Sequence, residues 1–291
     1  MIAFQPRTLE EAVGYLSLDP GLVPTAGCTD IMVRGIEALH KMDRVLDLLG
    51  ISELRGIREV EGGLEIGATT PFSEIRQSAM VRAAFPSLAA AAGQIGGWQI
   101  QNRATLGGNL ANASPAGDSL PVLLALDATL VLASAAGLRE VPYTVFHTGY
   151  RKTALQPGEI VARIRLPHLP PGTIQAFRKV GTREAQSISK VAVALAGRAE
   201  GGRITDVRLA AGSVAATPVR LRAAEEAVRG MAPGAEAAAV AGRAAAQEVK
   251  PIDDVRSTAE YRKFALERVV SRMVLALQSA PCRAWIFSSP L

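Results

Sequence analysis

The stretch that decides the fold runs from Arg103 to Ala128 and reads RATLGGNLANASPAGDSLPVLLALDA. It contains a pair of adjacent glycines, then small residues, and then an apolar run. Because glycines lack Cβ atoms, successive backbone N–H groups can converge there on an anion such as a diphosphate. An ordinary turn between a strand and a helix is the alternative interpretation. The candidate ligand-binding residues of this stretch are Thr105, Gly107, Gly108, Asn109 and Asp118.

A second stretch has a similar design and strengthens the first interpretation. It reads Pro24-Thr25-Ala26-Gly27-Cys28-Thr29-Asp30-Ile31 and follows the apolar pair Leu22 and Val23. Gly27 can make a turn, and Thr29 or Asp30 can cap the helix that follows, whose first amides could bind an anion. Two such loops could hold one diphosphate between them.

Composition and charge exclude several classes of protein. With 291 residues, of which 48% are hydrophobic, the chain is long for a single core, so we expect two domains. The net charge is +5, but no basic run alternates with aromatic residues, and we expect no nucleic-acid binding. The longest apolar run, 120–133, is too short for a membrane span and contains Asp127. The N-terminus lacks a signal-peptide pattern, so we expect a cytoplasmic protein.

The metal-binding residue types are too few and too scattered for a metal centre. The two cysteines, Cys28 and Cys282, lie far apart in the sequence, and the three histidines are dispersed. An iron–sulfur cluster needs about four thiolates. Any metal chemistry is therefore expected in a partner protein.

The first half of the chain reads as alternating strands and helices. Thr8 to Glu11 is a capping box, and strands over 22–26 and 44–48 flank a helix over 29–40 in a βαβ unit. A hairpin is expected over 56–67, a helix capped by Thr70, and a helix over 80–92. Strands are expected over 127–133 and 159–166, with a turn or short helix over 141–146. The loop over 93–102 carries Trp98, which could either flank a flat ring or pack its own loop.

The second half has a different pattern after the break at Pro167 to Gly172. Three strands are expected over 175–181, 190–199 and 203–212, the last two as a hairpin. Helices are expected from Thr217, over 235–248, and from Thr258, the last with its apolar face at Leu266, Val269, Val270, Met273 and Leu277. Antiparallel strands followed by helices indicate an α+β domain. The apolar segment over 281–287 is a candidate docking segment.

Several motifs, in this order and spacing, resemble one known family almost from end to end. They are Ala26-Gly27-Cys28-Thr29-Asp30, Ala104-Thr105-Leu106-Gly107-Gly108-Asn109, Ala113-Ser114-Pro115-Ala116-Gly117-Asp118, Gly149-Tyr150-Arg151-Lys152-Thr153, Phe177-Arg178-Lys179-Val180-Gly181, Thr217-Pro218-Val219-Arg220 and Asp254-Val255-Arg256 with Tyr261-Arg262. The chain resembles the FAD-binding medium subunit of the molybdenum hydroxylases, a family that includes xanthine dehydrogenase and carbon monoxide dehydrogenase flavoproteins. One departure is Cys28, where the family often has a second glycine.

The resemblance implies an α+β fold in two parts. A two-subdomain FAD-binding domain of the vanillyl-alcohol-oxidase/PCMH type would cover 1–173, with subdomains at about 1–55 and 56–173. A C-terminal domain of a three-stranded antiparallel sheet with helices would cover 174–284, and 285–291 would form a tail. The residues implied at the cofactor are Pro24, Thr25, Ala26, Gly27, Cys28, Thr29, Asp30, Ile31, Thr105, Gly107, Gly108, Asn109 and Asp118 at the diphosphate and ribityl chain, and Ile95, Val161 and Lys179 by the flavin or its adenine.

The resemblance also implies a role in electron transfer. A large molybdopterin subunit would oxidise the substrate, and a small subunit with two iron–sulfur clusters would pass electrons to the FAD held here. The FAD would then reduce NAD, a quinone or oxygen. Lys179 is the residue implied to favour the anionic reduced flavin, with a solvated strand lysine as the alternative. Two other functions stay open, namely a non-redox nucleotide-binding regulatory or assembly protein, and a free-standing flavin oxidase.

Overall fold

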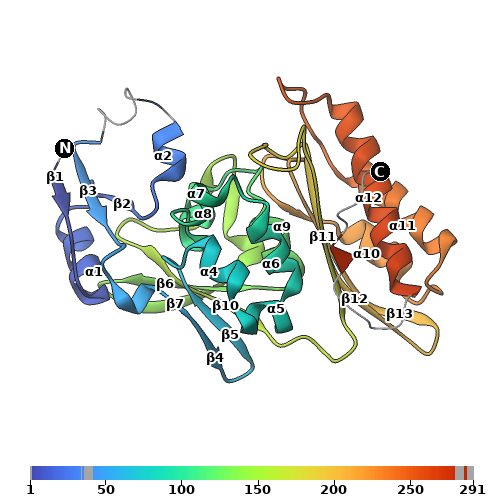
Figure 1. Ribbon diagram of the computed structural model, residues 1–291, viewed down its shortest axis with the longest axis horizontal. Helices are drawn as coiled ribbons and strands as arrows, with labels where there is room; N and C mark the ends of the chain where they lie inside the picture. The colour runs from blue at the N-terminus through green and yellow to red at the C-terminus, as the bar shows by residue number, and fades with distance from the viewer. Residues whose placement is uncertain (1, 34, 36–41, 279–284, 287–291) are drawn as a thin grey trace.

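The computed structural model describes residues 2–33, 35, 42–278 and 285–286. Three sheets with their helices follow one another along the long axis of the molecule, from the N-terminus at one end to the C-terminal helices at the other (Figure 1). The arrangement mixes helices with parallel and antiparallel sheets, which agrees with the expected α+β class. Among the described residues, no helix is long and apolar enough to cross a membrane.

The N-terminal unit is a small three-stranded parallel sheet. Its elements are β1 (Ile2–Phe4), α1 (Leu9–Leu18), β2 (Val23–Thr25), α2 (Thr29–Val33), β3 (Arg44–Asp47) and the short 3-10 helix η1 (Ser52–Leu54). The strand order β1-β3-β2 confirms the expected βαβ unit, to which the structure adds β1, a strand that was not predicted. Thr8 Oγ1 accepts a hydrogen bond from the Glu11 amide, while Glu11 accepts one from the Arg7 amide rather than from Thr8. The second half of the predicted helix over 29–40 lies outside the described residues.

The central unit is a five-stranded antiparallel sheet with helices on one face (Figure 1). Its strand order is β4-β5-β10-β6-β7, and a separate two-stranded hairpin, β8-β9, adjoins it. The strands are β4 (Ile57–Val60), β5 (Gly63–Gly67), β6 (Thr129–Ser134), β7 (Gly137–Pro142), β8 (His147–Gly149), β9 (Lys152–Thr153) and β10 (Ile160–Pro167). The helices are α4 (Phe72–Gln77), α5 (Ala79–Ala84), α6 (Pro86–Gly93), α7 (Trp98–Gln101), α8 (Leu106–Asn112), α9 (Ser119–Ala125) and the 3-10 helix η2 (Tyr143–Val145).

Two expectations for this unit were wrong, and one strand was missed. The single helix over 80–92 is two helices, because Pro86 has no N–H to continue α5 and instead begins α6. Thr70 does not cap α4, since its hydroxyl bonds to the backbone of Gly56 across the sheet edge and Pro71 precedes the helix. Strand β7 was missed, because its exposed polar side chains give no alternating apolar pattern.

The C-terminal unit is a sheet with helices on its outer face (Figure 1), antiparallel except at the edge strand β15, which pairs with β11 in parallel. Its strands are β11 (Ile174–Val180), β12 (Val191–Glu200), β13 (Arg203–Gly212), β14 (Val219–Arg220) and β15 (Trp285–Ile286), and its helices are α10 (Arg222–Val228), α11 (Ala235–Glu248), α12 (Ala259–Leu275) and the 3-10 helix η3 (Ala276–Gln278). The three expected strands are all present, with two-residue strands added at each edge in the order β14-β13-β12-β11-β15. Four of the five predicted apolar residues, Leu266, Val269, Val270 and Met273, lie on the buried face of α12, and the fifth, Leu277, is buried in η3 directly after it.

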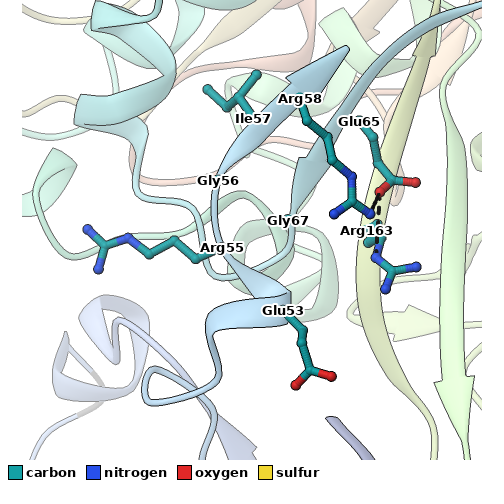
Figure 2. Close-up of a pocket in the computed structure, with 8 residues that line it drawn as sticks. All are labelled: Glu53, Arg55, Gly56, Ile57, Arg58, Glu65, Gly67 and Arg163. Carbon is teal, nitrogen blue, oxygen red and sulfur yellow. Dashed lines mark hydrogen bonds and ion pairs between the residues drawn. The ribbon is translucent and has the colours of Figure 1, made fainter. Parts of the chain in front are cut away.

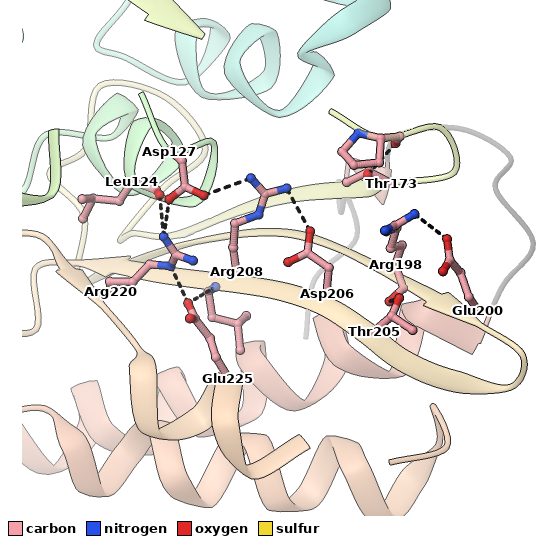
Figure 3. A network of polar contacts seen from close by, with 12 residues as sticks. Leu124, Asp127, Thr173, Arg198, Glu200, Thr205, Asp206, Arg208, Arg220 and Glu225 are labelled. Atoms are coloured by element: carbon pink, nitrogen blue, oxygen red, sulfur yellow. Dashed lines mark hydrogen bonds and ion pairs between the residues drawn. The ribbon is translucent and has the colours of Figure 1, made fainter. Parts of the chain in front are cut away.

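The central and C-terminal units share one interface. Strand β12 alternates in side-chain size, so that Ala192, Ala194 and Ala196 pack with the central core and Val191, Val193 and Leu195 pack with the C-terminal helices. The small alanine side chains let α9 approach the sheet closely. Asp127, just after α9, accepts hydrogen bonds from Arg208 and Arg220 of the C-terminal sheet at 3.1 and 2.6 Å (Figure 3).

Candidate cofactor-binding site

The two glycine-rich stretches predicted from the sequence lie against each other. Gly27 follows β2, and Arg103 precedes the loop that leads into α8. A Cβ atom added to Gly27 would lie 1.8 Å from the carbonyl oxygen of Arg103 and 3.0 Å from the Cα atom of Ala104. Only glycine permits this approach. The N-terminal unit and the central unit therefore meet where both candidate loops turn.

Cys28 has the backbone conformation that glycine favours. Its φ is +58°, in the left-handed region that costs a residue with a Cβ atom about 1–2 kcal/mol. The cysteine therefore adopts the conformation that a glycine would favour at this position. The half-buried thiol lies 3.3 Å from the carbonyl oxygen of Ala26, to which it donates a weak hydrogen bond, and burial raises the pKa of Cys28.

The adjacent glycines of the second loop have different roles. Gly107 is buried, its amide donates to the carbonyl of Ala68 at 2.8 Å, and an added Cβ atom would lie 2.5 Å from the Cβ atom of Ala68. Gly108 is exposed, and its amide donates to Oγ1 of Thr105, the N-cap of α8, at 3.1 Å. Both amides already have partners within the chain, so the expected nest of free amides at this glycine pair is wrong. Instead, the lack of a side chain lets Gly107 pack closely against Ala68 and leaves the surface at Gly108 open.

Other predicted residues are held in place by polar contacts. Asn109 accepts a hydrogen bond from the hydroxyl of Ser119 at 2.7 Å. Asp30 on α2 lies 3.5 Å from Arg151, whose guanidinium also donates to Asn112 at 2.9 Å. Arg151 therefore ties α2 to the end of α8 from the turn between β8 and β9. Arg151 belongs to one of the motifs that resemble the family, but no local pattern could predict these contacts because they join residues far apart in the chain.

Asp118 and Lys179 form a buried ion pair between the central and C-terminal units. The Lys179 Nζ atom lies 2.6 Å from Asp118 Oδ2 and 3.0 Å from the carbonyl oxygen of Gln94, and the lysine side chain is 4% exposed. Ser189 donates to the other oxygen of Asp118. Burial raises the pKa of Asp118, and the ammonium group of Lys179 opposes that rise. The alternative of a solvated strand lysine is therefore excluded.

Two further predicted residues, Ile95 and Val161, belong to the central core. Ile95 directly follows Gln94 and is half-buried against the central core, and Val161 is buried in β10 beside an irregularity in the strand pairing. Trp98, at the start of α7, is 70% exposed and has the guanidinium of Arg76 at 4.5 Å from its ring centroid. Trp98 therefore does not pack its own loop. Gln101 does so instead, by donating to the carbonyl of Gly93 at 2.9 Å.

A pocket of about 140 Å³ lies elsewhere, on the open side of the central sheet (Figure 2). It is lined by Glu53, Arg55, Gly56, Ile57, Arg58, Glu65, Gly67 and Arg163. Glu65 is buried and forms ion pairs with Arg58 and with Arg163 inside the pocket, which hold the polar side chains to one another. None of the predicted site residues lines this pocket, so it is not the candidate site. Among the described residues, no group of three or more histidine, cysteine or acidic side chains could hold a metal ion.

Comparison with known proteins identifies the family. Residues 2–169 match the family described as the FAD binding domain in molybdopterin dehydrogenase, and residues 175–277 match the CO dehydrogenase flavoprotein C-terminal domain. The chain belongs to the FAD-binding medium subunits of the molybdenum hydroxylases. It is 32% identical over 272 residues to the xanthine dehydrogenase FAD-binding subunit of Escherichia coli O157:H7, covering 92% of each chain.

Two further relatives agree with this assignment. The nicotinate dehydrogenase FAD-subunit of Eubacterium barkeri is 33% identical over 231 residues, or 77% of each chain. A chain of carbon monoxide dehydrogenase from Hydrogenophaga pseudoflava superposes with a TM-score of 0.91 at 32% identity, covering 97% of this chain and 98% of that one. FAD is therefore the cofactor of this medium subunit. The close contact at Gly27, the left-handed turn at Cys28 and the open surface at Gly108 fit an extended dinucleotide laid across the two loops.

Proposed function

We propose that this chain is the electron-transfer subunit of a molybdenum hydroxylase complex, in which FAD lies across the seam between the two glycine loops. The observation that carries the proposal is the contact of Gly27 with Arg103, which joins two loops that are far apart in the sequence. In this proposal 1–173 form the FAD-binding domain, with subdomains at about 1–55 and 56–173, and 174–284 form the C-terminal domain. Bound FAD would supply the redox chemistry, and the protein would bind and orient it.

The predicted site residues divide by position in this proposal. The diphosphate and ribityl chain would contact the predicted residues of the first loop, in 24–31, and of the second loop, in 105–109. Ile95, Val161 and the Asp118–Lys179 pair would lie toward the flavin. The buried ion pair supports a positioning role, because its partners come from both domains and would hold that end of the site at a fixed width. Asp118 also offsets the charge of Lys179, so a flavin would experience the pair rather than an isolated cation.

The partners would be a large molybdopterin subunit and a small subunit with two iron–sulfur clusters. Electrons would come from those clusters, and the FAD would pass them to NAD, a quinone or oxygen. The relatives act on substrates as different as xanthine, nicotinate and carbon monoxide according to their names, so the substrate would be chosen by another subunit. We also propose that the complex works in the cytoplasm and that this chain alone does not oxidise substrate.

Flavin binding tests the proposal directly. The purified chain is expected to be yellow, with the absorbance of a flavin, and to bind FAD more tightly than FMN because the two loops together suit a diphosphate. The apoprotein should be titrated with each flavin while protein fluorescence is followed. Equal affinity for FAD and FMN would contradict the diphosphate site, and a colourless chain that binds only ADP or ATP would favour the regulatory nucleotide-binding alternative.

A further inference from the structure

An arginine lies at the seam of the two loops and has no partner in the described part of the chain. The backbone carbonyl of Arg103 touches Gly27, while the Arg103 side chain is exposed. The charges of Asp47 and Arg103 have opposite effects on Cys28, since Asp47 raises the pKa of the thiol and Arg103 lowers it. The positive charge of Arg103, a residue of the second loop, is therefore felt at the first loop.

Several other groups that could bind a diphosphate are already engaged. The amides of Gly107 and Gly108 donate to Ala68 and Thr105. Arg151 is bonded to Asn112 and paired with Asp30, and Lys179 is buried against Asp118. A diphosphate diester carries two negative charges, and the acid Asp47 near the first loop would repel it. An unpaired guanidinium can bind phosphate oxygens through two parallel hydrogen bonds. Such a charge-assisted contact would neutralise part of the diphosphate charge and offset its repulsion by Asp47.

We propose that Arg103 binds the diphosphate of FAD and thereby selects the dinucleotide over flavins that lack a diphosphate. This inference rests on the FAD site proposed above. Arg103 would act on binding and selection, and it would take no part in electron transfer. The same guanidinium would lock the two loops together once the diphosphate lies between them.

The test is a comparison of FAD and riboflavin binding by the full-length apoprotein and its variants. Arg103→Gln is expected to weaken FAD binding by about tenfold to a hundredfold, the range of a charge-assisted hydrogen bond, and to leave riboflavin binding unchanged. The affinity of the unmodified chain for FAD should fall more steeply with added salt than that of the variant. Arg103→Lys should lie between the two. Arg82→Gln is the matched control, because Arg82 is an exposed arginine of α5 outside both loops.

The binding results distinguish a failure of the role proposed for Arg103 from a failure of the proposed FAD site. Equal weakening of FAD and riboflavin by Arg103→Gln would show a structural role for Arg103 and overturn the inference. FAD binding by Arg103→Gln equal to that of the unmodified chain would also overturn it, while leaving the FAD site intact. An unmodified chain that binds neither flavin would overturn the FAD site itself. Thermal melting of each apoprotein variant shows whether it is folded.

Discussion

At the scale of single residues, Gly27 decides whether the two loops can meet. Gly27→Ala would place a Cβ atom 1.8 Å from the Arg103 carbonyl oxygen, so the loops must separate. We expect a loss of about 1–3 kcal/mol in the free energy of unfolding, together with loss of bound FAD. Gly14→Ala is the control, because an added Cβ atom there has nothing within 4 Å. Urea unfolding and flavin content measure the two effects, and a Gly27→Ala protein that keeps full flavin content would contradict the contact.

A substitution at Gly108 is expected to affect flavin binding more than the stability of the fold. The nearest neighbour of an added Cβ atom is Thr105 Oγ1 at 2.8 Å, at the end of a short side chain, and the residue is otherwise exposed. Because the Thr105 cap must shift, Gly108→Val should cost about 1 kcal/mol of folding free energy, while it would block the open surface where FAD would lie. The purified variant should be folded by circular dichroism and colourless. A folded variant with full flavin absorbance would mean that FAD does not approach this surface.

At the scale of elements, Asp127 fastens α9 to the C-terminal sheet (Figure 3). Its carboxylate bonds to Arg208 and Arg220, while its φ of +50° suits aspartate or asparagine. Asp127→Asn keeps the backbone and removes the charge. Because the carboxylate is 45% exposed and both arginines keep other acidic partners, we expect a loss of about 1 kcal/mol, measured by urea unfolding. An unchanged free energy of unfolding would show that the ion pairs contribute nothing.

Asp254, just before α12, makes the stability of the fold depend on pH. Desolvation would raise the pKa of Asp254, but hydrogen bonds from the amides of Arg256 and Ser257 and from the guanidinium groups of Arg256 and Arg262 lower that pKa to about 2. The unfolded chain binds the proton near the ordinary pKa of 3.8, so this stabilisation is complete above that pH and is lost as the pH falls toward 2. Asp254→Asn should flatten the acid limb of the stability profile between those values. An unchanged acid limb in urea unfolding at several pH values would contradict it.

Local patterns predicted most elements of this chain, and long-range contacts account for what they missed. Helix α11 was predicted at its observed bounds because its alanine-rich sequence has a clear start and end. The break between α5 and α6 was missed although Pro86 signalled it, since the apolar pattern continued across the proline. The bonds of Gly107 to Ala68 and of Lys179 to Asp118 join residues distant in sequence, so no local signal could show them. The sequence therefore predicted which two loops would meet, while the partners of Gly107, Gly108 and Lys179 became visible only in the structure.

At the scale of the whole molecule, we expect this chain to carry electrons for a complex and to oxidise no substrate alone. The whole chain has two cysteines, too few for an iron–sulfur cluster, so substrate electrons would need a partner subunit to reach the FAD. The direct measurement is anaerobic absorbance of the FAD-loaded chain mixed with xanthine, aldehydes, nicotinate and carbon monoxide in turn. We expect no bleaching by any of them, full bleaching by dithionite, and bleaching by one substrate once the molybdopterin and iron–sulfur subunits are added. Bleaching by a substrate without those subunits would show that this chain has its own substrate site and would contradict the account.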